Sequence, residues 1–332
     1  MRILVSGGAG YVGSVSVERL IEAGHEVTVL DSLVTGHRGA IAPGAELVVG
    51  SVGDPDLVGP LLRRRRIEAV LHCAARSLVG ESVREPELYE RENVQGGQAF
   101  LRALAAAGVD RFVYSSTAAV YGMPDAMPIT EATPTEPINP YGVTKLRFEA
   151  ALAKAAATSG LRAVALRYFN VAGATLACGE VHDPETHLIP NLLRAVETGE
   201  PVTLFGDDYP TPDGTAIRDY VHVLDLADAH LAALELTASM APGLTIANLG
   251  SGTGFSVRQV LDAAELAVGA AVPHVAGPRR EGDPPILVAA NERARELLGW
   301  TPRRGTLAEM IGSAWAWRLA HRPDRAAEGD AG

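Results

Sequence analysis

Tyr141 and Lys145 are the two side chains whose types and spacing most directly indicate chemistry. Residues four apart on an α-helix project from one face, about one turn apart. An ammonium group beside a phenol favours the phenolate, so it lowers the tyrosine pKa from ~10 toward the working pH. We therefore expect Tyr141 to act as a general base toward a sugar or alcohol hydroxyl.

The helix that would carry this pair is predicted from its composition. Pro140 suits a first helical turn, and residues 145–155 are mostly good helix formers. An exposed lysine beside a half-buried tyrosine would show the same spacing. The functional interpretation therefore depends on the rest of the chain.

Three consecutive hydroxyl residues follow a predicted strand at 111–114. An open α/β sheet places its chemistry at the carboxyl ends of its strands. The alternative, that they cap a following turn, holds for one or two of the three. The residues are Ser115, Ser116 and Thr117.

A glycine-rich turn connects a predicted strand at 2–6 to a predicted helix that ends near Ala23. Its glycines allow a tight turn, close approach of a pyrophosphate, and close packing of helix on strand, while the first amides of the helix bind the anion. The spacing is Gly-x-x-Gly-x-x-Gly. The residues predicted to form this site are Gly7, Gly10, Tyr11, Val12 and Gly13.

Asp31 ends the second predicted strand, at 26–30. A carboxylate at this place accepts hydrogen bonds from the adenosine ribose and repels a 2′-phosphate, which favours NAD over NADP. Asp54 follows the third strand and precedes Pro55. It either accepts from the adenine amino group or caps a helix, and the sequence leaves both open.

The order of predicted elements indicates the fold class. Strands and helices alternate to about residue 170, which predicts an α/β, Rossmann-like doubly wound parallel sheet. Longer loops then predict a smaller C-terminal substrate-binding lid domain. We expect residues 1–174 to form an NAD-binding domain to which 224–268 return. We expect 175–223 and 269–325 to form mainly the lid, and 326–332 a frayed tail.

Composition excludes several classes of function. The net charge of −11 over 332 residues argues against nucleic-acid and anionic-membrane surfaces. Two cysteines, no long apolar run and a strand-like start predict a cytoplasmic protein without a secretory signal. His72 has no partner at metal-ligand spacing, and the sequence analysis predicts no metal site.

Several segments carry a resemblance to a known family. The most specific is 202–223, which contains Phe-Gly-Asp-Asp-Tyr-Pro-Thr-Pro-Asp-Gly-Thr and Arg-Asp-Tyr-Val-His-Val; further matches are 78–83, 168–170 and 280–283. By these motifs the chain resembles the extended short-chain dehydrogenase/reductases over nearly its whole length, and within them the UDP-glucose 4-epimerases. The glycine turn and Tyr-x-x-x-Lys indicate only the superfamily.

The resemblance implies NAD-dependent interconversion of UDP-galactose and UDP-glucose. Tyr141 would take the proton of the sugar 4-hydroxyl while C4 gives a hydride to tightly bound NAD. The 4-keto intermediate would rotate and receive the hydride on its other face, which regenerates NAD in each cycle. Lys145 would bind the nicotinamide ribose and, with the positive nicotinamide, keep the Tyr141 pKa low. Thr117, with Ser116, would hydrogen-bond the 4-oxygen.

The resemblance also implies binding roles for further residues. Arg218 and Arg280 would hold the diphosphate, and Asp283 the uridine ribose. The other implied substrate contacts are Thr117, Tyr141, Phe169, Asn170, His187, Leu188, Tyr220 and Leu287. The other implied cofactor contacts are Ala74, Asn93, Ser115, Tyr141, Lys145 and Tyr168.

Three positions depart from the family pattern. His187 stands where many members have asparagine, which leaves its diphosphate contact open. Gly97 follows Gly96 where threonine is usual, and we expect a change in packing only. Leu287 falls where the family's residue influences tolerance of a 2-N-acetyl group, so UDP-N-acetylhexosamine or another NDP-sugar remains an alternative substrate.

Other classes of function are disfavoured. An NDP-sugar dehydratase usually has an Asp-Glu pair after the active-site threonine, whereas Ala118-Ala119 follow Thr117. Asp31 and the 202–223 segment disfavour a dehydrogenase with exchangeable cofactor. The intact Thr117, Tyr141 and Lys145 set disfavours a non-catalytic regulator. The family further implies a homodimer that pairs the helices around 86–107 and 141–157.

Overall fold

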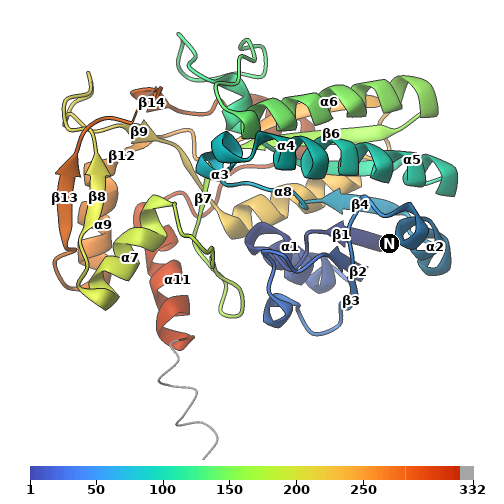
Figure 1. Ribbon diagram of the computed structural model, residues 1–332, viewed down its shortest axis with the longest axis horizontal. Coiled ribbons are helices and arrows are strands. Elements are labelled where there is room, and N and C mark those ends of the chain that lie inside the picture. Colours follow the sequence, from blue (N-terminus) through green and yellow to red (C-terminus); the bar gives the residue numbers. More distant parts are fainter. Residues whose placement is uncertain (281, 322–332) are drawn as a thin grey trace, which may run out of the picture.

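The computed structural model describes residues 1–280 and 282–321 and is built on a seven-stranded sheet (Figure 1). Every strand pair in it is parallel, and the order is β11-β6-β5-β4-β1-β2-β3. This confirms the predicted Rossmann-like fold. The strands are β1 (Arg2–Ser6), β2 (Glu26–Asp31), β3 (Glu46–Val49), β4 (Ala69–His72), β5 (Arg111–Thr117), β6 (Arg162–Tyr168) and β11 (Gly243–Leu249).

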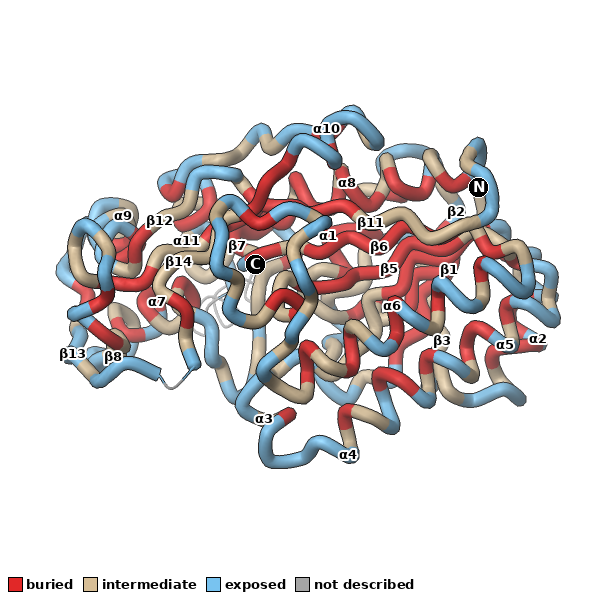
Figure 2. The backbone as a smooth tube through the Cα atoms, turned by 90° about the horizontal axis from the view of Figure 1, so that it is seen from above, coloured by how far each residue is buried: buried red, intermediate tan, exposed pale blue. Residues whose placement is uncertain are grey.

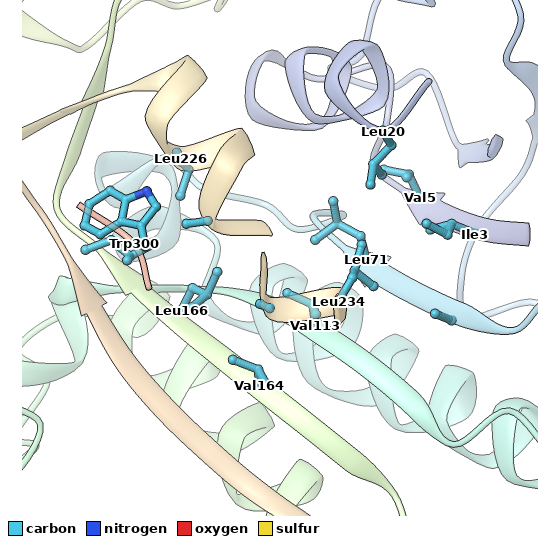
Figure 3. Packing of buried hydrophobic residues seen from close by; sticks show 14 of the residues in the cluster. Ile3, Val5, Leu20, Leu71, Val113, Val164, Leu166, Leu226, Leu234 and Trp300 are labelled. Atoms are coloured by element: carbon cyan, nitrogen blue, oxygen red, sulfur yellow. The ribbon is translucent and has the colours of Figure 1, made fainter. Parts of the chain in front are cut away.

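Helices cover both faces of this sheet, because its central strands are apolar on both sides. On one face α1 (Tyr11–Glu22) and α8 (Val223–Leu236) pack on Val5, Leu71 and Val113 (Figure 3). On the other face α2 (Pro55–Arg65), α5 (Gly97–Ala107) and α6 (Pro140–Ser159) pack on the alternate strand residues. The central strands are consequently buried along most of their length (Figure 2).

A smaller region lies beside the carboxyl edge of the sheet (Figure 1). Its core is formed by α7 (Leu188–Thr198), α9 (Val257–Val268) and α11 (Leu307–Ala320). Within the described part of the chain, three small sheets accompany them. Their strands are β7 (Asn170–Ala172), β8 (Val202–Phe205), β9 (Ile217–Arg218), β10 (Tyr220–His222), β12 (Phe255–Ser256), β13 (His274–Gly277) and β14 (Ile286–Leu287).

The boundaries expected for the returning segment need correction. As expected, β11 is a strand of the large sheet and α8 packs on that sheet. However, α9 buries Val260, Leu261 and Ala264 against α7 and α11. The return therefore ends near residue 250 rather than 268. Conversely, α10 (Glu292–Leu298), which we expected mainly in the lid, places Ala294 in the core beside α8. The tail 326–332 lies outside the described residues.

The segment expected to be helical around 86–107 is helical over its whole length. It runs as α4 (Pro86–Tyr89), the π-helical segment η2 (Glu90–Gly96) and then α5, after the short α3 (Val79–Arg84). A Cβ atom at Gly97 would lie 2.4 Å from Cε2 of Phe148 on α6. Gly97 is therefore required where α5 packs against α6. Among the described residues, none of the helices is both long and apolar enough to span a membrane.

Glu149 holds α6 to the sheet. Its Oε1 accepts hydrogen bonds from Ser116 Oγ on β5 at 2.6 Å and from Arg167 Nε on β6 at 2.9 Å. Its Oε2 accepts from Arg167 Nη2 at 2.5 Å. All three residues are almost fully buried. Because positions 141, 145 and 149 share one helical face, this ion pair also sets where Tyr141 and Lys145 point.

Glu149→Gln should lower the free energy of unfolding by about 3–5 kcal/mol, because it leaves Arg167 as an unpaired buried charge. Glu90→Gln is the matched control, since it removes an exposed ion pair to Arg147 on the same helix. That pair should contribute no more than about 1 kcal/mol. Urea unfolding measures both losses, and equal losses would contradict the anchoring role of Glu149.

Candidate active site

The predicted chemical residues meet where β5 ends and α6 begins. Asn139 caps α6 by accepting from Gly142 N at 2.8 Å, and Pro140 occupies its first turn, as predicted. Lys145 Nζ donates to the Ser115 carbonyl at 2.7 Å and lies 5.8 Å from the centroid of the Tyr141 ring. The Thr117 hydroxyl hydrogen-bonds the Tyr141 phenol. The structure therefore brings Thr117, Tyr141 and Lys145 into one site.

The Tyr141 pKa in this structure is raised, contrary to the lowering expected from the spacing. Burial disfavours the phenolate and raises the pKa of Tyr141 to about 12, while the Thr117 hydrogen bond opposes the shift. Burial likewise lowers the pKa of the Lys145 ammonium to about 8. The sequence rule considered only the neighbouring charge and left out the desolvation that both side chains undergo.

Ser116 is separated from this site. Successive side chains of a strand point to opposite faces, so Ser116 faces α6 and donates to Glu149, whereas Ser115 faces α8. Ser115 Oγ lies 3.1 Å from His230 Nε2 and 3.1 Å from Cys73 Sγ. The predicted catalytic role of Ser116 is therefore corrected to that of a residue that holds the helix.

The glycine turn has the geometry that a pyrophosphate requires. Gly7 has φ +75° and approaches the next strand so closely that a Cβ would lie 2.4 Å from Ala74 N. A Cβ on Gly13 would lie 2.0 Å from the Gly7 oxygen, whereas one on Gly10 would lie 3.5 Å from it, an ordinary contact. No described side chain caps the first turn of α1. The first amides of α1, from Tyr11 onward, therefore suit an anion.

Asp31 also lies at this turn. Its Oδ2 accepts from Ala9 N at 2.9 Å and its Oδ1 from Leu33 N at 2.8 Å, so the carboxylate is fixed beside the glycines. Asp54 is the N-cap of α2, since its Oδ1 accepts from Asp56 N and Leu57 N. The structure thus favours the capping interpretation of Asp54.

Asn93 is hydrogen-bonded to the loop that follows β4. Its side-chain oxygen accepts from Arg76 N at 2.8 Å, and its amide donates to Arg76 O and to Thr144 Oγ1. Because these groups are already paired, Asn93 orients the loop after β4.

Tyr168, at the end of β6, packs edge-on against His230 on α8. Burial lowers the pKa of His230 to about 3, so that imidazole is neutral.

The predicted substrate residues gather on the small strands. Leu287 and Arg218 are paired across β14 and β9, and Tyr220 and Asn170 across β10 and β7. Phe169 packs in the same apolar cluster as Leu287. Phe169 and Asn170 directly follow β6, at the carboxyl edge of the large sheet.

Arg218 and Asp283 contact each other directly. Arg218 Nη2 donates to Asp283 Oδ1 at 2.5 Å, and the Tyr209 hydroxyl donates to Asp283 Oδ2 at 3.4 Å. The Arg280 guanidinium stacks over Phe205, 4.3 Å from its centroid. Two arginines and an acid expected to share one ligand therefore lie on neighbouring strands and loops.

His187 contacts other residues than these arginines do. It is the N-cap residue of α7, just before Leu188. Its Nδ1 is 2.8 Å from Glu180 Oε1 and 2.9 Å from Glu185 Oε1. These two acids and His182, which joins them, were not predicted as site residues from the sequence. Glu149 and Arg167 were not predicted either, because in the sequence they look like surface charges and only the fold brings them together.

Comparison with known proteins gives consistent matches. The family model described as "NAD dependent epimerase/dehydratase family" matches residues 3–250. The chain is 50% identical over 322 residues to a UDP-glucose 4-epimerase of Corynebacterium glutamicum, covering 96% of each protein. It is 48% identical to one from Streptomyces lividans, covering 96% of this chain and 97% of that protein.

Solved structures agree with these matches. A crystal structure of a UDP-glucose 4-epimerase superposes with a TM-score of 0.94 at 45% identity, covering 97% of this chain and 98% of that one. A UDP-glucose 4-epimerase from Brucella ovis, crystallised with NAD, gives 0.92 at 42% identity, covering 95% and 97%. Both matches extend over the large sheet and the smaller region.

In the ligand-free protein, Tyr141 should remain a phenol to at least about pH 10, because burial raises its pKa to about 12. The measurement is tyrosinate absorbance against pH for the wild type minus Tyr141→Phe. A Tyr141 component that ionises near neutral pH without any ligand would contradict the dominance of burial.

Proposed function

This chain belongs to the NAD dependent epimerase/dehydratase family, and on that premise we propose that it is an enzyme that interconverts UDP-galactose and UDP-glucose by inverting C4 of the sugar. The observation that carries the proposal is the site itself. Thr117, Tyr141 and Lys145 lie together at the carboxyl edge of the sheet. The glycine turn with Asp31 lies at the same edge, in a chain 50% identical to a UDP-glucose 4-epimerase over 322 residues.

The cofactor is NAD, and the residues present fit it. The glycine turn and the start of α1 would hold the pyrophosphate, and Asp31 the adenosine ribose. Lys145 would hold the nicotinamide ribose. The small side chain of Ala74 would let the cofactor lie against the protein backbone. Bound there, NAD supplies the acceptor and the donor of the hydride, so that none is consumed.

Tyr141 moves the proton. Its phenolate would accept the proton of the sugar 4-hydroxyl and return it when the other epimer forms, while Thr117 aligns the 4-oxygen. Because burial alone raises the Tyr141 pKa to about 12, positive charge is needed to form the phenolate. The protonated Lys145 ammonium is one such charge, 5.8 Å from the phenol ring centroid.

The small strands would hold the nucleotide sugar. Arginine guanidinium groups suit phosphate oxygens, so Arg218 and Arg280 would bind the diphosphate. Asp283 would accept from the uridine ribose. Phe169 and Asn170 would line the sugar pocket, and Leu287 would limit the group tolerated at the sugar C2.

The arrangement of domains, the oligomeric state and the location are also proposals. Residues 1–174 and 224–250 would form the NAD-binding domain, with most of the rest forming the lid. Free Cys73 and Cys178 support a cytoplasmic location. A homodimer would pair α5 and α6, whose exposed positions carry small side chains such as Ala105, Ala150 and Ala153.

Tyr141→Phe should abolish conversion of UDP-galactose to UDP-glucose, because it removes the group that carries the proton. NMR of the reaction mixture measures the product, and the NAD content of the variant shows that the cofactor site is intact. Activity within about tenfold of the wild type would remove the general-base assignment. Wild-type conversion of UDP-N-acetylgalactosamine alone would keep the mechanism and change the substrate.

Asp31→Asn should relax the choice of cofactor, because it keeps the side-chain shape but removes the charge that repels a 2′-phosphate. We expect the ratio of the NADP and NAD dissociation constants to fall by about tenfold or more. Fluorescence titration of cofactor-depleted protein measures both constants. An unchanged ratio would exclude Asp31 from the ribose contact.

Ala153→Glu should convert the dimer to a monomer, because it places a charge in the middle of the proposed helix-pairing face. Sedimentation velocity measures the mass. Ala271→Glu, on an exposed loop of the smaller region, is the control and should remain dimeric. A wild-type monomer, or an Ala153→Glu dimer as stable as the wild type, would exclude this interface.

A further inference from the structure

Four side chains of metal-ligating type converge on the loop between β7 and α7. They follow one another as Glu-x-His-x-x-Glu-x-His, and one ligand atom from each lies within 4.8 Å of all the others. The four residues, called here the loop cluster, are Glu180, His182, Glu185 and His187. Of these four residues only His187 was predicted as a site residue from the sequence, and no metal site was predicted.

The separations in the loop cluster match those around a metal ion. His187 Nδ1 is 2.8 Å and 2.9 Å from oxygens of Glu180 and Glu185. His182 Nδ1 is 3.1 Å and 3.8 Å from oxygens of the same two acids. Bonds of about 2.1 Å in a tetrahedron place neighbouring donor atoms ~3.4 Å apart. The four atoms therefore need little movement to share one ion.

One polar atom of the loop cluster has no conventional explanation. His182 Nδ1 is buried and makes no hydrogen bond with proper geometry among the described residues, although a Glu180 oxygen lies 3.1 Å away. In its deprotonated form this ring nitrogen would present a lone pair to the space that the carboxylate oxygens also face, as a metal ligand does. The side chain of Glu180 is 9% exposed and that of Glu185 10%, so two carboxylates are withdrawn from water.

Charge also favours a cation at this place. Glu180 and Glu185 bring two carboxylates together with little exposure to water. A divalent ion bound to the two imidazoles would neutralise both carboxylates.

We propose that Glu180, His182, Glu185 and His187 form a binding site for a divalent transition metal, with Zn²⁺ as the ion that this donor set fits. Two imidazoles and two carboxylates at tetrahedral spacing are typical of zinc, whereas magnesium and calcium prefer six or more oxygens. The site is distinct from Tyr141 and Lys145 and does not depend on the proposed epimerisation.

The surroundings indicate what the metal does. The Tyr11 hydroxyl at the start of α1 donates to Gly173 O at 2.5 Å, where the loop begins. Cys178 packs against Val15 of α1, and the Trp317 ring of α11 lies directly against Gly179. The loop thus runs between α1 and α11 (Figure 1). A metal would cross-link this loop at the place where it contacts both α1 and α11. It would thereby help to position the start of α1, which follows the glycine turn.

The test uses the full-length chain without an affinity tag, treated with a chelator and titrated with Zn²⁺ in a calorimeter. We expect one ion per chain with a dissociation constant below ~1 μM. Co²⁺ should give the visible absorption bands of four-coordinate cobalt. Binding weaker than ~100 μM, or a six-coordinate cobalt spectrum, would overturn the proposal.

Two variants locate the site. His182→Gln should weaken Zn²⁺ binding by about 100-fold or more. His187→Asn should do the same, and it places a favourable N-cap residue before α7, which covers the case in which His182→Gln fails to fold. His274→Gln, at an exposed position on β13, and Cys178→Ser should both bind as the wild type does. Loss of binding in Cys178→Ser, or wild-type binding in His187→Asn, would contradict the assignment.

Discussion

The buried ion pair between Glu149 and Arg167 is the constraint on which the site depends. It ties α6 to β6, and through Ser116 to β5, at the level where the strands end. An ion pair this deep contributes little net stability against apolar replacements, but it is directional and penalises a shifted helix. We infer that its role is to fix the rotation of α6. Tyr141 and Lys145, two turns and one turn before Glu149, then face the edge where Thr117 lies.

Burial makes the site depend on its ligands. The protein alone raises the pKa of Tyr141 to about 12 and lowers that of Lys145 to about 8, so each group tends toward its neutral form. A bound cofactor with a positively charged ring adds the charge that favours the phenolate. The general base would thus be formed when the cofactor is present, which limits unproductive proton transfer in the empty protein.

Local patterns predicted much of this molecule. The glycine turn, Asp31 and the Tyr-x-x-x-Lys pair each occupy one strand–turn or one helix, so their spacing carries the information. Long-range partners decided the rest. Ser116 and Asn93 resembled active-site residues, but each is paired with a residue that only the fold brings near. The loop cluster was overlooked because its residues lie in an irregular loop, where no periodic pattern predicts which side chains converge.

The most direct measurement follows deuterium through one conversion. UDP-galactose carrying deuterium at C4 is incubated with the purified protein in ordinary water, without added cofactor, and the product is examined by NMR. The proposed mechanism predicts UDP-glucose that keeps deuterium at C4, because the hydride leaves and returns within one site while Tyr141 moves only the hydroxyl proton. Loss of the deuterium to water, or accumulation of a 4-keto or dehydrated product, would contradict it.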